Sequence, residues 1–221
     1  MRGYKVLFLI FVSIMVFAMN IKEVEAIESK LILIDPGHGG FDGGAEVDGI
    51  KEKDLNLQVS LLFKEELMKR GYKVILTRDK DEAIRLDDKH GKIRKGEDMA
   101  ARCKMKMDSN CDMFISIHMN QFPESKYFGG QVWYSEYEKS KVLASIVQKN
   151  FKVKINEKNK RVEKSAGDHF KVLRCNDVVP ALIVECGFLS NAEELRKLNS
   201  EEYQRKLAKM LTDSIDEYYK S

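Results

Sequence analysis

Short apolar runs that alternate with amphipathic segments constrain the fold of this chain most strongly. From residue 30 onward, runs such as LILI (31–34) and ALIV (181–184) are separated by stretches with helical periodicity. A strand that is apolar throughout is buried on both faces, as in parallel sheets covered by helices on both sides. The alternation therefore predicts a single α/β domain with a mostly parallel central sheet flanked by helices.

The expected elements follow from the same pattern. We expect strands at 30–35, 72–77, 113–118, 131–134, 170–173 and 181–185. We expect helices at 53–70, 97–108, 135–150, 192–198 and 201–219, with Gly71 as a natural end for the first. The charged stretch 79–96 is expected to be a long loop, and the lysine-rich stretch 153–168 an exposed loop or edge segment.

The first residues have the pattern of a targeting segment. Arg2 and Lys5 precede an apolar run at 6–19, which fits a signal peptide and is shorter than the about 20 residues of a membrane span. Cleavage is expected after Ala26, with an uncleaved membrane anchor and a buried core helix as alternatives. The predicted organisation is a leader at 1–26 and one domain at 27–221, exported beyond the cytoplasmic membrane.

Charge and cysteine content limit the function classes. The net charge of +3 does not favour nucleic acid as a partner, and we expect none. The cysteines Cys103, Cys111, Cys175 and Cys186 have no C-x-x-C spacing, which disfavours a cysteine zinc site. Export would permit disulfides. The spacing does not say whether any form, and four reduced, mostly buried cysteines remain an alternative.

Chemically reactive side chains stand at the ends of three predicted strands. His38 follows the first strand within Pro36–Gly40, His118 ends the third, and Glu185 ends the run ALIV. Ligands of open α/β sheets bind beyond the carboxyl ends of the strands. Each histidine alone could be incidental to the site, but two at such ends favour a shared function.

Two imidazoles and one carboxylate, with water in the fourth place, form an open catalytic zinc site. The carboxylate should come from the segment after His38, where the choices are Asp42, Glu46, Asp48, Glu52 and Asp54. Glu52 has the advantage of a rigid helix start, although a helix-terminal charge is its ordinary role. Glu185 would serve as a general base for water and then return the proton to a leaving amine.

Five stretches stand in order along residues 31–218. They are ILIDPGHGGFDGGA (32–45), KEKDLNLQVS (51–60), VILTRDKD (74–81), CDMFISIHMNQF (111–122) and PALIVECGFLSNAEE (180–194). With them the sequence resembles the zinc-dependent N-acetylmuramoyl-L-alanine amidases of the amidase-3 family. Any one stretch is a weak signal, whereas all of them in order are specific.

The resemblance implies a set of roles. It implies that His38, Glu52 and His118 bind Zn²⁺ and that Glu185 is the catalytic glutamate. It selects Glu52 from the acidic residues above. Arg78, Arg102 and Asn120 match positions that support the site in the family.

The resemblance also implies a substrate and a cellular setting. Enzymes of this family cleave the amide between the lactyl group of N-acetylmuramic acid and L-alanine of the peptidoglycan stem peptide. The compact form, with IRKGEDMAAR (93–102) and GGQVWY (129–134), looks most like the sporulation amidases that prepare muramic-δ-lactam in spore cortex. We expect action in the space between forespore and mother-cell membranes. With no separate wall-binding module expected, retention at the membrane or a spore-envelope protein partner would bring the enzyme to its substrate.

Other features are less specific. Phe122, Trp133 and Tyr134 could stack on sugar, although core packing is expected for at least two of them. The lysines at 152, 154, 158, 160 and 164 could face anionic wall polymer, and a solvated loop is the preferred interpretation. His90 and His169 have no strand-end placement. Alternative functions are a zinc peptidase acting on wall peptides and a non-catalytic wall-binding or scaffold protein.

Overall fold

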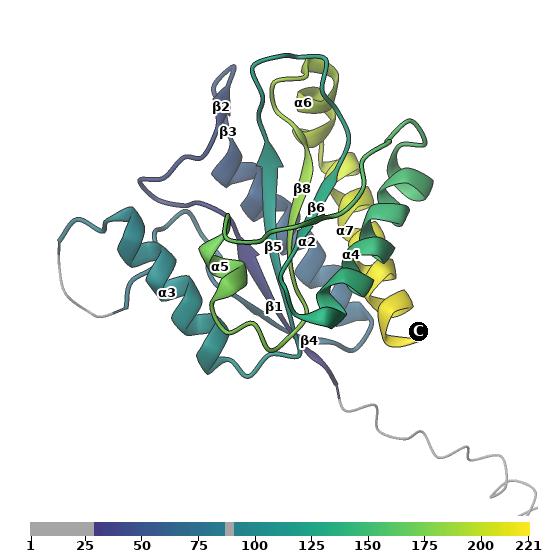
Figure 1. Ribbon diagram of the computed structural model, residues 1–221. Helices are drawn as coiled ribbons and strands as arrows, with labels where there is room; N and C mark the ends of the chain where they lie inside the picture. Colours follow the sequence, from purple (N-terminus) through teal and green to yellow (C-terminus); the bar gives the residue numbers. More distant parts are fainter. Residues whose placement is uncertain (1–28, 87–90) are drawn as a thin grey trace, which may run out of the picture.

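The computed structural model describes residues 29–86 and 91–221 (Figure 1). The predicted leader at 1–26 and His90 lie outside these residues. No helix within the described part of the chain is both long and apolar enough to cross a membrane.

The predicted mostly parallel sheet is confirmed. Its six strands lie in the order β4-β1-β5-β8-β6-β7. Neighbours among β4, β1, β5 and β8 are parallel, whereas β6 runs antiparallel to β8 and parallel to β7. The bounds are β1 Leu31–Pro36, β4 Lys73–Leu76, β5 Met113–Asn120, β6 Gln131–Tyr134, β7 Lys164–Ser165 and β8 Ala181–Phe188. A separate antiparallel hairpin, β2 Glu46–Val47 and β3 Ile50–Lys51, follows β1.

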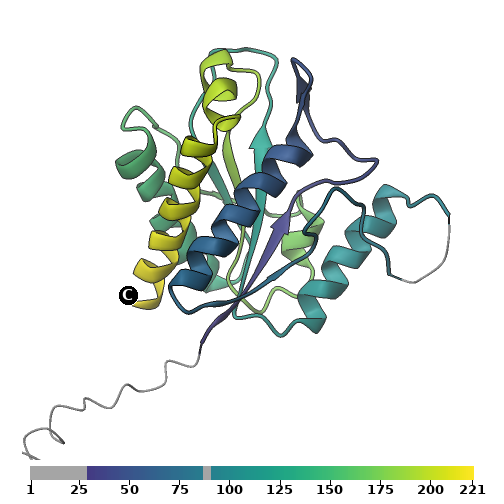
Figure 2. The same ribbon diagram turned by 180° about the vertical axis from the view of Figure 1, so that it is seen from behind.

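Helices cover both faces of the sheet. One face carries α2 (Glu52–Lys69), α4 (Glu138–Asn150) and α7 (Glu201–Tyr219), and α4 ends in a π-helical turn, Phe151–Ile155. The other face carries α3 (Lys95–Asp108) and the single turn α5 (Lys171–Arg174), as the two opposite views in Figures 1 and 2 show. α6 (Ala192–Leu198) follows β8 and begins at Asn191, whose side chain accepts from the backbone N–H groups of Glu193 and Glu194.

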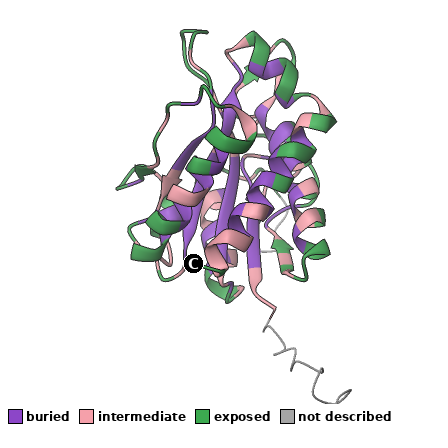
Figure 3. Ribbon diagram, turned by 90° about the vertical axis from the view of Figure 1, so that its right-hand side faces the viewer, coloured by how far each residue is buried: buried purple, intermediate pink, exposed green. Residues whose placement is uncertain are grey.

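The hydrophobic core lies in two layers, one on each side of the sheet. Along β1, Ile32 and Ile34 pack toward α2 and α7, whereas Leu33 packs toward α5. This two-residue alternation explains why the strand is apolar throughout. The central strands are buried, and the exposed residues gather on the outer faces of the helices and in the loops (Figure 3).

The segment 170–173 forms a helical turn, so its prediction as a strand was wrong. Val172 and Leu173 are buried against the sheet from this turn, and their apolar character reflects docking on a sheet face. A disulfide between Cys103 of α3 and Cys175 joins the end of the turn to its neighbouring helix. The structure therefore decides the question of cysteine pairing that the spacing left open, and Cys111 and Cys186 are free and buried.

Lys106 of α3 is a buried cation in the same layer. Its ammonium donates to the carbonyl oxygens of Val172 and Leu173, at 3.2 and 3.4 Å, and lies 5.0 Å from the centre of the Phe114 ring. Burial lowers the pKa of Lys106 from 10.5 to about 8, and the charge of Asp177 acts in the opposite direction. The folded protein thus holds this proton less tightly than the unfolded chain does.

This lowered pKa predicts a pH-dependent stability. Between about pH 8 and 10.5 the unfolded chain binds more protons at this position, so the free energy of unfolding contributed by Lys106 rises with pH. Lys106→Met removes the titration. The stability of the variant relative to the wild type should fall by about 2 kcal/mol as the pH rises from about 7.5 to about 10. Urea denaturation of both proteins at each pH measures the change, and a constant difference would contradict the assignment.

Candidate metal centre and active site

The carboxyl ends of β1, β5 and β8 lie at one edge of the sheet, the upper edge in Figure 1. His118 on β5 stands opposite Glu185 on β8 in the strand register. His38 follows the end of β1 by two residues. Three side chains that the sequence placed at strand ends are therefore held at neighbouring positions by sheet pairing.

A tight turn after β1 brings His38 toward His118. The backbone N–H of Gly37 donates to the carbonyl oxygen of Ile117 at 3.0 Å. A Cβ atom on Gly37 would lie 2.3 Å from the His118 ring, so only glycine permits this approach. His38 itself adopts a left-handed conformation, with φ of 60°, which is uncommon for a residue with a side chain. The two imidazole rings lie 5.0 Å apart between their centres.

The β2–β3 hairpin sets the position of Glu52. Its turn consists of Asp48 and Gly49, both with positive φ (54° and 78°) between the paired residues Val47 and Ile50. Asp-Gly in a two-residue turn is the strongest short signal for a hairpin, and the sequence carries it at 48–49, outside the elements predicted above. The hairpin closes with the N–H of Glu52 donating to the carbonyl oxygen of Ala45 at 2.8 Å, and Glu52 begins α2.

His38, Glu52 and His118 converge in one cluster. Glu52 Oε2 lies 3.2 Å from His38 Nε2, and Glu52 Oε1 lies 3.0 Å from His118 Nδ1. One nitrogen or oxygen atom from each residue lies within 4.8 Å of the others, a spacing that could hold a metal ion. Two neutral imidazoles and a carboxylate form the donor set of open zinc sites, so the residues present fit zinc.

The carboxylate of Glu52 is held as an anion. Burial acts to raise its pKa, but hydrogen bonds and charge interactions with His118 and His38 lower the pKa well below its usual range. The backbone N–H groups of Ala45 and Met119 donate to its two oxygens at 3.0 and 3.1 Å. Burial acts to lower the pKa of His118, and Glu52 raises it above the usual value.

Asp42 contributes to the site in a way that the sequence analysis missed. Its carboxylate Oδ2 lies 3.0 Å from Nδ1 of His38, while Nε2 of the same ring faces Glu52. A carboxylate on the second nitrogen fixes the tautomer and orientation of a ligating histidine. Asp42 was considered only as an alternative ligand, and the four-residue spacing in HGGFD was the available signal. Glu46, Asp48 and Asp54 are exposed and lie outside the cluster.

A buried ionic network supports the turn that carries His38. Arg102 of α3 pairs with Asp35 of β1 and donates to the carbonyl oxygens of Pro36 and His38, at 3.0 and 2.7 Å. Arg78 donates to the carbonyl oxygens of Pro36 and Gly37, each at 2.9 Å. The resemblance indicates both arginines as supporting residues, and these contacts show what each of them holds in place.

Asp35 anchors this network within the sheet. Its carboxylate accepts hydrogen bonds from Thr77 at 2.6 Å and Ser116 at 2.7 Å as well as from Arg102. Burial acts to raise its pKa, but Arg102 and the two hydroxyls lower it below the usual value. The turn after β1 is thereby tied to β5, to α3 and to the residue that follows β4.

Glu185 has an unsatisfied oxygen at the site. Oε2 is buried and, among the described residues, no donor reaches it. An orphaned buried carboxylate oxygen is costly and indicates that a group absent from the protein chain completes its hydrogen bonding. Burial raises the pKa of Glu185 to about 7, with His118 and His38 acting in the opposite direction and Glu52 adding to the increase.

The remaining predicted residues lie around the site or outside it. Asn120 lines a hollow next to the strand ends, together with Trp133 and the exposed Phe122. Trp133 and Tyr134 are half-buried and pack against opposite core layers, in agreement with the expected packing role. His169 is exposed and takes no part in the cluster.

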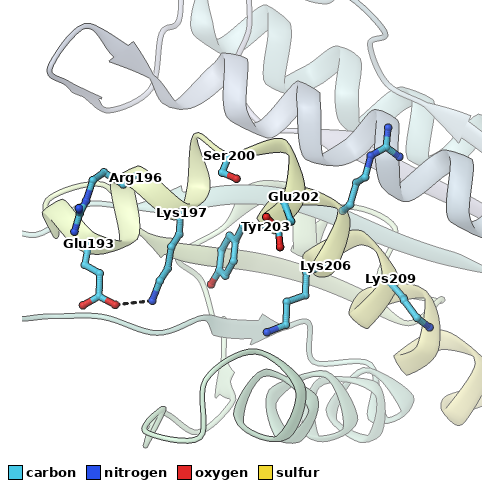
Figure 4. A pocket seen from close by; sticks show the side chains of 9 residues that line it. Glu193, Arg196, Lys197, Ser200, Glu202, Tyr203, Lys206 and Lys209 are labelled. Atoms are coloured by element: carbon cyan, nitrogen blue, oxygen red, sulfur yellow. Dashed lines mark hydrogen bonds and ion pairs between the residues drawn. The ribbon is translucent and has the colours of Figure 1, made fainter.

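A second, wider hollow of about 920 Å³ lies along α6 and α7. Figure 4 shows its lining, which includes Lys197 paired with Glu193. None of the residues placed at the metal centre or beside Glu185 lines it, so it is separate from the strand-end chemistry.

The chain is similar to proteins of known family. Residues 32–217 match a family model described as N-acetylmuramoyl-L-alanine amidase. The chain is 32% identical over 195 residues to the germination-specific N-acetylmuramoyl-L-alanine amidase of Bacillus subtilis (strain 168), covering 87% of this chain and 81% of that protein.

Solved structures agree with this match. The CwlD amidase from Clostridioides difficile, solved in complex with the GerS lipoprotein, is 35% identical with a TM-score of 0.81, covering 87% of this chain and 99% of that one. The N-acetylmuramoyl-L-alanine amidase from Clostridium difficile 630 is 30% identical with a TM-score of 0.75, covering 87% and 98%. The similarity to each spans most of this chain.

Proposed function

The chain belongs to the N-acetylmuramoyl-L-alanine amidase family and is an amidase acting on peptidoglycan, and from this premise we propose a zinc-dependent mechanism. His38, Glu52 and His118 hold the zinc ion, and Glu185 moves the proton. The observation that carries the proposal is the convergence of those three side chains within 4.8 Å, next to the sheet position of Glu185 with its unpartnered oxygen.

The residues divide the reaction between them. A zinc ion bound by the cluster supplies Lewis acidity to the scissile carbonyl and lowers the pKa of water. Glu185 accepts a proton at Oε2 from the attacking water and then donates it to the amide nitrogen as the C–N bond breaks. The products are a lactyl carboxylate on N-acetylmuramic acid and a peptide with a free amino group on L-alanine. Asp42 keeps the His38 ring oriented throughout.

The biological setting is a finer proposal. The similarity to a germination-specific amidase of Bacillus subtilis and to the CwlD amidase supports a role in spore cortex, where removal of stem peptides leads to muramic-δ-lactam. The enzyme then acts outside the cytoplasmic membrane, and residues 1–26 direct it there as a leader or an anchor. Because the Clostridioides difficile relative was solved with the GerS lipoprotein, we propose that this amidase also works with a protein partner at a membrane.

Product analysis tests the activity and separates the alternatives. Purified protein should release peptides that begin with L-alanine and leave the glycan intact, as read by mass spectrometry of digested peptidoglycan. A zinc peptidase would instead cut within the stem peptides. A wall-binding scaffold would bind the wall and release nothing. Either of those results would overturn the proposed reaction.

A further inference from the structure

A groove with an aromatic lining begins at the catalytic strand ends. A hollow of about 330 Å³ is lined by Asn120, two residues beyond His118, and by Gln131 and Phe188. Phe188 pairs with Asn120, and Gln131 pairs with Glu185, in the strand register. The hollow therefore lies beside the position where the amide bond is cut.

The groove continues away from the strand ends over aromatic rings. Tyr127 contacts Phe122 and Phe188, with ring centres 4.9 and 6.3 Å apart. Tyr127 and Arg161 line both the first hollow and a second of about 520 Å³. The two hollows thus share a wall and form one groove.

Cations without ion-pair partners border this groove. The guanidinium of Arg161 lies 4.3 Å from the centre of the Phe188 ring, and the ammonium of Lys164 lies 5.2 Å from that of Trp133. Within the described residues, no ion pair involves Arg161, Lys164 or the neighbouring Lys126, Lys158 and Lys160.

One acidic residue, Glu194, affects the charge equilibrium of Arg161 but forms no ion pair with it among the described residues. Glu194 interacts electrostatically with Arg161, but its two oxygens accept hydrogen bonds from the backbone N–H groups of Gly129 and Phe188. Arg161 donates through Nε to the carbonyl oxygen of Phe128 at 2.9 Å, and no hydrogen bond within the described residues uses its terminal nitrogens.

The hollow along α6 and α7 provides a contrast. There Lys197 pairs with Glu193, Arg205 with Glu201, and Lys209 with Asp213. Three of the five cations that line that hollow are thus paired within the chain, whereas none of the groove's cations forms an ion pair within the described residues.

We infer that the groove binds the stem peptide of the substrate through its carboxylates, with Arg161 and Lys164 as specificity-determining residues. The inference rests on the proposed function, because it takes the peptide as the leaving side of the cleaved amide. The glycan side of that amide carries neutral hydroxyl and acetamido groups. The peptide side carries a carboxylate on the D-glutamate that follows L-alanine, and a peptide attached to the reacting amide is already within reach of the groove. Charge-assisted hydrogen bonds from Arg and Lys suit such carboxylates.

The test compares two peptidoglycan preparations that differ only at that D-glutamate, with a free carboxylate in one and a carboxamide in the other. The wild type should show about tenfold higher kcat/KM on the free-carboxylate wall. Lys164→Gln and Arg161→Gln should bring the ratio close to one, mainly by slowing hydrolysis of that wall. Arg161→Lys should restore part of the preference. The side chain of Lys164 is exposed and makes no hydrogen bond within the described residues, so its variant remains informative if Arg161→Gln fails to fold.

Lys206→Gln, in the hollow along α6 and α7, is the matched control and should leave the ratio unchanged. Equal rates of the wild type on the two walls would overturn the inference while leaving the amidase reaction intact. Variants that lose activity only on walls carrying phosphate polymers would also overturn it, in favour of a polymer site. Absence of L-alanine peptides from both walls would overturn the proposed function, and the inference with it.

Discussion

Glu185→Gln is expected to lower kcat for amide hydrolysis by about 10²–10⁴-fold while leaving bound zinc unchanged. Glutamine keeps the size of the side chain but cannot accept the proton that Oε2 takes from water. Oε2 has no partner among the described residues, so the substitution breaks no hydrogen bond within the described chain. Initial rates of L-alanine peptide release, with zinc measured per protein chain, give the two readouts.

The control for this variant is Glu157→Gln, an exposed glutamate outside the site, which should have wild-type rates. Loss of zinc together with activity would place Glu185 among the metal-binding groups. Unchanged kcat would remove Glu185 from the mechanism altogether.

The second large expected effect is the loss of hydrolysis when the metal is removed. Dialysis against a chelator should abolish hydrolysis, and added Zn²⁺ should restore it.

Glu52→Gln should lower zinc affinity. The carboxylate of Glu52 lies 3.2 and 3.0 Å from the two imidazoles and provides the anionic member of the donor set. Zinc is titrated into the metal-free wild type and variant, and the bound metal and the thermal shift on binding are measured. These readouts give the change in zinc affinity independently of catalysis.

Asp42→Asn gives a graded comparison for the same centre. An amide in place of the carboxylate that faces His38 Nδ1 should weaken zinc binding by about 10–100-fold, less than the loss of a ligand. Undiminished activity of protein whose zinc has been removed by exhaustive chelation would contradict a metal mechanism for this enzyme.

The sequence predicted the central sheet well, although β5 and β8 continue to Asn120 and Phe188, beyond the predicted ends at His118 and Glu185. Wholly apolar runs identify strands buried on both faces, and parallel strands bring their carboxyl ends to one edge. His38, His118 and Glu185 could therefore be grouped without coordinates. Glu52 was chosen by family resemblance, because helix-start acids are common and spacing alone does not distinguish one that faces a site.

The remaining features depend on tertiary context. Phe170–Leu173 is too short for periodicity to separate a strand from a helical turn, and the outcome was set by docking against a sheet face. The pairing of Cys103 with Cys175 depends on how α3 and the α5 turn meet across 72 residues of sequence. The Asp48-Gly49 hairpin was predictable, since its turn signal is local and strong.

The disulfide has a topological consequence for a chain that is cut. The stretch 121–126 after β5 is exposed, and exposed loops are preferred sites of proteolytic nicking. A cut there separates His38, Glu52 and His118 from Glu185 along the backbone. The bond between Cys103 and Cys175 spans the cut, so both fragments remain one covalent molecule. A nicked enzyme would migrate as an intact chain on a non-reducing gel and separate into two bands only after reduction.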